Sequence, residues 1–117
     1  MEQGYLALVL HAHLPYVRHL EGEKYLEQRW LFEAITETYI PLLQVFQGLL
    51  DDKVDFRVTM SLSPTLISML TDGLLQERYA QYLNSLIKLA QAEVSRTKED
   101  PKLSCLAEYY VKNFTSI

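Results

Sequence analysis

Two histidines, His11 and His13, are the residues whose type and spacing point most directly to chemistry. They follow residues 5–10, a run without any charged side chain. Such a run is typical of a strand buried on both faces in a parallel sheet, a fold in which ligands bind beyond the carboxyl ends of the strands. Because side chains alternate along an extended chain, residues 7, 9, 11 and 13 share one face. We therefore expect both imidazoles to point into the same space.

The pair by itself has three interpretations: substrate binding, metal binding, or two structural histidines that end a strand. The structural interpretation is the default for so short a motif. Metal-dependent hydrolases on barrel folds can open with His-x-His at the end of the first strand, and His19 offers a third ligand. A catalytic zinc normally has three protein ligands, however, and neither Cys105 nor another histidine lies near a predicted strand end. We therefore expect no metal and no other cofactor.

Two further candidates lie on the helix predicted next. Glu33 and Glu37 are four residues apart, but acids that cleave glycosides must flank a bond in a cleft, about 5 to 10 Å from each other. Charged residues on one helix face are usually there for solvation, which we favour here. Trp30 lies at the start of the same helix, where its indole either packs at the rim of the fold or stacks on a sugar ring. Both interpretations of Trp30 stay open.

The elements that must position these residues alternate between strand and helix. A loop over residues 14–26 leads to an amphipathic helix over residues 27–51. Pro41 lacks a backbone donor and predicts a kink or short interruption of that helix at residues 39–42. Residues 54–63 then alternate between apolar and polar side chains, which predicts a second strand. Its apolar face should lie under helices, and its polar row should face a lumen or cleft: Arg57, Thr59 and Ser61.

Three helices should follow. Ser63 and Pro64 resemble an N-cap and first helical position, which predicts a short helix to about residue 70. After a turn at residues 71–73, a long helix is expected over residues 74–97, and Asp100 with Pro101 predicts a last helix. Core packing explains most of the tyrosines in these helices. The side chains expected to be buried in the last helix are Leu103, Leu106, Tyr110 and Phe114.

This order predicts an α/β fold, since strand-helix-strand connections of this length normally form parallel units. Two strands cannot complete a sheet. The chain is therefore expected to be the opening of a larger α/β barrel, with parallel strands and helical crossovers. Its unpaired strand edges would associate with the remainder of the barrel or with another copy.

Composition narrows the classes of partner. The chain of 117 residues is 49% hydrophobic and 22% charged, an ordinary globular mixture. Its formal net charge of -4 makes a nucleic acid partner unexpected. A single cysteine and a start without a signal peptide predict a cytoplasmic protein. No apolar run approaches the roughly 20 residues needed to cross a bilayer, so no membrane partner is expected.

Three ordered blocks resemble the start of a family 57 glycoside hydrolase: HAHLPYVRH (residues 11–19), WLFEAITETYIPLL (residues 30–43) and FRVTMSLSP (residues 56–64). Within the family the resemblance is closest to the 1,4-α-glucan branching enzymes of glycogen and starch synthesis. Amylase and glucanotransferase members usually carry glutamine where this chain has Leu14, which favours the branching subgroup. The resemblance implies that residues 1–117 form the N-terminal part of an incomplete seven-stranded β/α barrel.

The resemblance also implies a retaining double displacement on an α-glucan, by a glutamate nucleophile and an aspartate acid/base, without a metal. His11 and His13 would bind the glucose ring at the point of cleavage, and Trp30 would add an aromatic platform. The family's two catalytic carboxylates lie on later strands, so we expect no catalytic residue in residues 1–117 and no activity of this chain alone. The alternatives are a family 57 α-amylase or 4-α-glucanotransferase, a non-catalytic remnant or glucan-binding module, and a metal hydrolase.

Overall fold

A computed structural model describes residues 3–21 and 25–117 of the chain. The predicted succession of strand, helix, strand and further helices is confirmed. The expectations for residues 1–2 and for residues 22–24 of the predicted loop lie outside the described residues. The elements are β1 (Val9–Ala12), α1 (Leu26–Ala34), the π-helical turn η1 (Ile35–Tyr39), α2 (Ile40–Asp51), β2 (Thr59–Leu62), α3 (Pro64–Leu70), α4 (Gly73–Arg96) and α5 (Pro101–Thr115).

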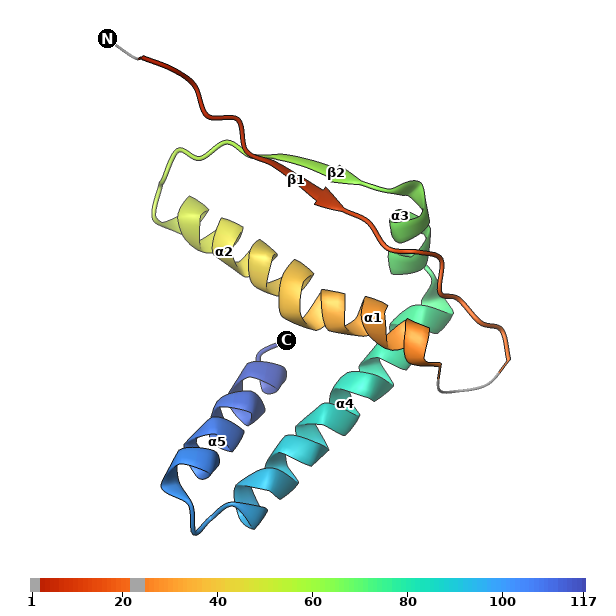
Figure 1. The fold of residues 1–117 in the computed structure, drawn as a ribbon, viewed down its shortest axis with the longest axis vertical. Helices are drawn as coiled ribbons and strands as arrows, with labels where there is room; N and C mark the ends of the chain where they lie inside the picture. The colour runs from red at the N-terminus through yellow and green to blue at the C-terminus, as the bar shows by residue number, and fades with distance from the viewer. Residues whose placement is uncertain (1–2, 22–24) are drawn as a thin grey trace.

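The strands β1 and β2 form a parallel pair, as predicted, and α1, η1 and α2 make the crossover between them on one side of the sheet (Figure 1). The described part of the chain contains this two-stranded sheet and not a barrel. Both strands are shorter than predicted, and β1 is not buried on both faces, since Val9 is 61% exposed. Among the residues that the structure describes, each strand pairs only with the other, so the hydrogen-bonded ladder is as long as the stretch over which the two strands run together.

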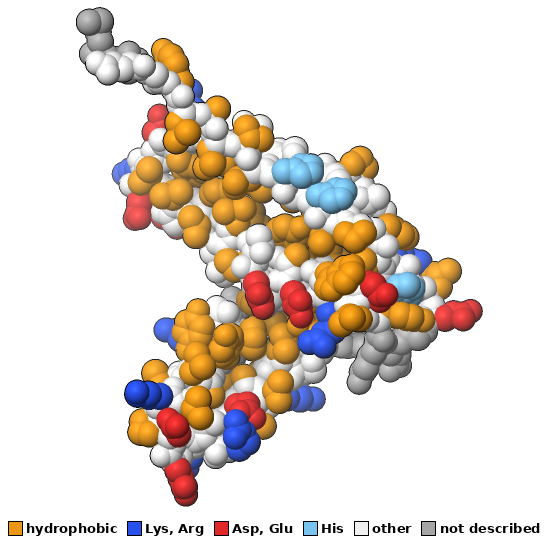
Figure 2. Space-filling view, in the orientation of Figure 1, with side chains coloured by type: hydrophobic (Ala, Val, Ile, Leu, Met, Phe, Trp, Pro, Cys, Tyr) orange, Lys and Arg blue, Asp and Glu red, His pale blue; other side chains and the backbone are white. Residues whose placement is uncertain are grey.

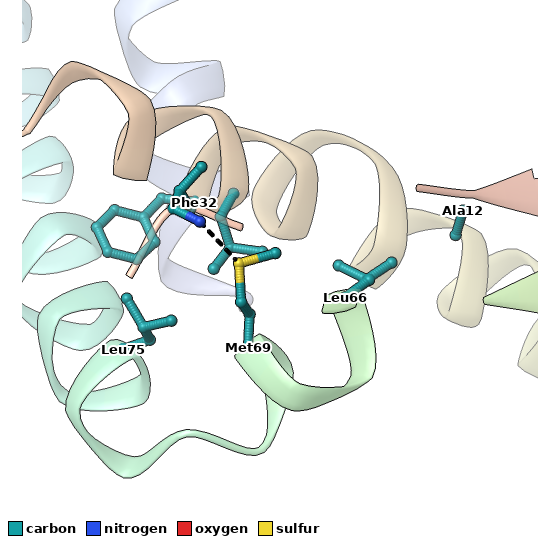
Figure 3. Close-up of a cluster of buried hydrophobic side chains, with 7 residues drawn as sticks. Ala12, Phe32, Leu66, Met69 and Leu75 are labelled. Atoms are coloured by element: carbon teal, nitrogen blue, oxygen red, sulfur yellow. Dashed lines mark hydrogen bonds between the residues drawn. The ribbon is translucent and has the colours of Figure 1, made fainter. Parts of the chain in front are cut away.

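The core lies where α3 meets β1, α1 and the start of α4 (Figure 3). Leu66 and Met69 of α3 are fully buried and pack with Ala12 of β1, Phe32 of α1 and Leu75 of α4. Each buried aliphatic side chain of this kind stabilises the fold by roughly 1.5 to 3 kcal/mol. The short helix α3 therefore connects the sheet to the helices.

Polar caps fix where the later helices begin. The Ser63 hydroxyl accepts a hydrogen bond from the backbone N–H of Leu66 at 3.3 Å, and Asp100 caps α5, as predicted. Asp72, which the sequence placed in a turn, accepts from the backbone N–H of Leu75 at 3.0 Å and so caps α4. Each cap satisfies amide donors that the first turn of a helix leaves unpaired.

The predicted interruption of the first helix lies about one turn earlier than expected, at the π-helical turn η1. Pro41 has no N–H to donate to the carbonyl of residue 37, so the irregularity falls in the turn that precedes the proline. Inside η1, the Thr36 hydroxyl donates to the Phe32 carbonyl at 2.9 Å and lies 3.2 Å from the Tyr79 hydroxyl of α4. The wide turn is thus anchored to the neighbouring helix.

The buried face predicted for α5 is largely wrong. Leu103, Leu106 and Tyr110 are about half exposed, and Ala107 is the buried residue. Helices α4 and α5 pack against each other, and Ala90 of α4 is buried as well as Ala107 of α5. The apolar residues along one side of α4 are all buried or half-buried: Leu75, Tyr79, Tyr82, Leu83, Leu86, Ile87, Ala90 and Val94. Tyr79 and Tyr82 contact the core, whereas Tyr109 is exposed, so core packing does not explain all the tyrosines.

No helix within residues 3–21 and 25–117 is both long enough and apolar enough to span a membrane.

The chain that follows β1 is irregular but is held by α3 and α4. Arg18 donates through Nε to the Asp72 carboxylate at 2.5 Å, and Arg78 donates to the backbone carbonyl of His19 at 2.8 Å. The backbone N–H of Val17 donates to the Met69 sulfur at 3.3 Å, the hydrogen bond drawn in Figure 3. These contacts link residues more than 50 positions apart. They fix the position of the segment that follows the two histidines.

Asp72 makes this link sensitive to acid. The backbone N–H of Leu75 and the Arg18 guanidinium lower the pKa of the Asp72 carboxyl, against the opposing effect of partial burial. A carboxyl whose pKa is lower in the folded protein stabilises the fold above its ordinary pKa, and this contribution is lost as the pH falls through the lowered value. Below about pH 4, the free energy of unfolding should therefore fall less steeply with acidification in Asp72→Asn than in the unchanged protein. Urea unfolding at a series of pH values measures this.

Two arginine variants test the other side of this ion pair, one at Arg18 and a control at Arg57. Arg18→Gln should lower the free energy of unfolding at neutral pH, because it removes the partner of Asp72. Arg57→Gln removes the same charge from a side chain that is 90% exposed and should leave that free energy unchanged. Equal pH slopes for Asp72→Asn and the unchanged protein would contradict the role given to the carboxylate.

Candidate functional site

The predicted convergence of the two histidines is confirmed. His11 lies in β1 and His13 follows its end, and both side chains are exposed. Their rings stack with centroids 5.8 Å apart and planes at 15°. The pair forms a patch of imidazole on the open side of the sheet, visible as the two adjacent pale-blue side chains in Figure 2. The alternation of side chains along an extended chain is sufficient to produce this arrangement.

A third residue, Ser61, belongs to the same site. It is paired with His11 in the parallel register of β1 and β2, and its Oγ lies 2.5 Å from His11 Nδ1. The sequence placed Ser61 in the polar row of the second strand without giving it a partner. The available signal was that the polar row was predicted to face a lumen or cleft and that the two histidines were predicted to point into one space. The register that places Ser61 beside His11 could not be predicted from either strand alone.

The sheet has two unlike faces at this point. His11, Thr59 and Ser61 lie on the open face and are exposed, as predicted for the polar row. On the opposite face Ala12 is buried against the helices, although coverage is incomplete because Leu62 beside it is 44% exposed. Polar side chains therefore gather on the uncovered face, at the carboxyl end of β1, where parallel α/β folds bind ligands.

The other candidates lie apart from the pair. Trp30 is 46% exposed on α1 and has no ring contact with either histidine within the described residues. The His19 ring stacks on Tyr25 at 4.0 Å, so it is engaged elsewhere. Across residues 3–21 and 25–117, no group of three or more His, Cys, Asp or Glu side chains is placed to hold a metal ion.

The acidic residues of α1 and η1 behave as surface charges. Glu33 lies 3.8 Å from Arg29 one turn earlier, with both side chains about half exposed, and Glu37 is exposed. Burial raises the pKa of Tyr82, and the Glu33 carboxylate adds to the increase. An exposed ion pair of this spacing contributes only about 0.3 to 0.5 kcal/mol. This geometry agrees with the solvation interpretation of Glu33 and Glu37.

The arrangement at His11, His13 and Ser61 is suited to binding a ligand rich in hydroxyl groups. Each neutral imidazole offers one donor and one acceptor, and the serine hydroxyl offers both. In the described part of the chain, no ion pair joins a carboxylate to either histidine; the ion pairs present are Arg18–Asp72, Arg29–Glu33, Arg57–Asp55 and Arg96–Glu93. The three side chains therefore offer both hydrogen-bond donors and acceptors to a ligand on the open face of the sheet.

Comparison with known proteins agrees with the resemblance seen in the sequence. The family model described as glycosyl hydrolase family 57 matches residues 7–116. The chain is 38% identical over 111 residues to a 1,4-alpha-glucan branching enzyme of Thermococcus kodakarensis, covering 94% of this chain and 16% of that protein.

Two solved structures are similar to nearly the whole chain. A GH57-type branching enzyme from Pyrococcus horikoshii superposes with a TM-score of 0.89 at 33% identity, over 98% of this chain and 21% of that one. The alpha-amylase AmyC from Thermotoga maritima superposes with a TM-score of 0.86 at 50% identity, over 94% of this chain and 21% of that one. The chain thus spans about a fifth or less of the length of these relatives. Because the family model covers nearly all of it, the chain belongs to glycosyl hydrolase family 57.

Proposed function

We propose that His11 and His13 bind an α-glucan as part of the active site of a 1,4-α-glucan branching enzyme. The observation that carries the proposal is the stacked imidazole pair on the uncovered face of a parallel sheet, at the carboxyl end of β1. Each histidine offers a ring nitrogen to the hydroxyls of one glucose unit. The exposed indole of Trp30 is available as an apolar platform for another part of the glucan.

Branching is favoured over hydrolysis by the relatives and by one residue. A curated relative and a solved structure that match this chain are both named branching enzymes. Leu14 occupies the position where amylases and glucanotransferases of the family usually carry glutamine. The second candidate is an α-amylase, which the 50% identity to the Thermotoga maritima enzyme supports.

The cleavage step itself is proposed to depend on residues outside this chain. A retaining enzyme of this kind needs two carboxyl groups about 5 to 5.5 Å apart on either side of the glycosidic bond. No acidic side chain of the described residues forms an ion pair with the histidines. Glu33, Asp72 and Glu93 pair with arginines instead, and they lie on helices or at the start of one. We take the chain as the first part of an incomplete barrel, with the open sheet face towards the lumen and the carboxylates supplied by later strands.

Activity on amylose separates these proposals. The purified 117-residue chain should neither branch nor shorten amylose, because in this proposal the carboxylate pair lies on later strands. A protein that combines this chain with the remaining strands should add branches, detected by debranching and chain-length analysis. Shortening without branches would select the amylase candidate. Measurable turnover by the 117-residue chain alone would refute the proposal that its catalytic residues lie elsewhere.

The binding role of the pair is tested by removing each imidazole. His11→Ala and His13→Ala should each weaken maltoheptaose binding by about 2- to 10-fold, the range expected for one hydrogen bond. His19→Ala is the matched control, since it removes the third histidine, whose ring stacks on Tyr25 away from the pair. Isothermal titration calorimetry gives the dissociation constants. Equal weakening by all three substitutions would show that the pair has no special role.

A further inference from the structure

We infer that Ser61 is a positioning residue that fixes the tautomer and orientation of His11. This inference deepens the proposed function, because its consequence for glucan binding depends on the role given to His11. Ser61 belongs to a different strand from the histidines and is separated from His11 by 50 positions in the sequence. The two side chains meet only because β1 and β2 pair in this register.

The contact between Ser61 and His11 is short and specific. Ser61 Oγ lies 2.5 Å from His11 Nδ1, at the short end of the range for a hydrogen bond that involves a hydroxyl. Within the described residues, this is the one side-chain hydrogen bond that either group makes. The contact allows either group to be the donor, and in the arrangement inferred here the Ser61 hydroxyl donates its proton to the ring nitrogen. When it does so, Nδ1 is the unprotonated nitrogen and Nε2 carries the N–H.

The stacking of His13 supplies the second constraint on His11. The His13 ring is nearly parallel to the His11 ring, at 15° and with the centroids 5.8 Å apart, and so limits its rotation. The hydrogen bond to Ser61 decides which edge of the His11 ring faces β2. The edge that bears Nε2 is then left for a ligand. With the proton on Nε2, His11 acts as a hydrogen-bond donor, which suits the lone pairs of a sugar hydroxyl or ring oxygen.

Neighbouring residues cannot substitute for Ser61. Thr59 is on the same face of β2, but its register partner is Val9, which offers no polar group. Met60 and Leu62, which flank Ser61, point to the opposite face because side chains alternate along a strand. Removal of the Ser61 hydroxyl therefore leaves Nδ1 of His11 without a side-chain partner among the described residues, and both neutral tautomers become populated.

Nitrogen NMR of the histidine side chains tests this inference without a ligand. In protein labelled with 15N-histidine, at about pH 9 where a free imidazole is neutral, long-range proton–nitrogen spectra distinguish the two tautomers of His11. We expect the Nε2–H tautomer in the unchanged protein and in Ser61→Thr, and a mixture in Ser61→Ala. Thr59→Ala is the matched control and should leave the spectrum of His11 unchanged. His11→Gln assigns its signals.

The outcomes separate the inference from the proposed function. Unchanged His11 nitrogen signals in Ser61→Ala, or an Nδ1–H tautomer in the unchanged protein, would overturn the positioning role. A tautomer mixture that Ser61→Thr restores supports it. The dissociation constant for maltoheptaose should then rise about 2- to 10-fold in Ser61→Ala, as for the loss of one oriented hydrogen bond. A changed tautomer with unchanged affinity would keep the positioning role and refute glucan binding by His11.

Discussion

The parallel pairing of β1 with β2, in the register that places His11 beside Ser61, is the constraint on which the site depends. Parallel strands cannot be joined by a tight turn, so the chain must cross over through α1, η1 and α2. That crossover lies on one side of the sheet and leaves the other side open (Figure 1). A slip of one residue would turn Ser61 to the helical side and place Met60 or Leu62 beside His11.

The helices fix this register through a small core and a few polar links. Leu66 and Met69 of α3 attach the end of β2 to β1 and α1, since α3 begins directly after β2. Arg18 and Arg78 hold the segment after His13 against the start of α4. The backbone position of His11 is thereby fixed by pairing with β2, and that of the segment after His13 by contacts with the helices. The imidazoles are exposed, but their backbone is not free to rearrange.

Local signals in the sequence were enough for much of this fold. Ser63 with Pro64 and Asp100 with Pro101 marked helix starts correctly, because a cap acts within one turn of its own helix. The alternation of apolar and polar residues located β2, and the spacing of the two histidines gave their shared face.

The remaining features depend on contacts between distant segments. In α5, apolar residues lie on more than one face, and only the presence of α4 selects Ala107 over Leu103 or Leu106 as the buried residue. The lengths of the strands depend on how far two segments run together. The hydrogen bond between Ser61 and His11 depends on register, which neither strand specifies alone.

The most direct test of this account is to map where a glucan contacts the protein. Chemical-shift changes on titration with maltoheptaose should be largest at the side chains of His11 and His13 and at Ser61, on the open face of the sheet. They should be small at Tyr109 and Tyr110, the exposed aromatic residues of α5. Changes confined to those tyrosines, with the histidine signals unmoved, would contradict the claim that the imidazole pair is the glucan-binding surface.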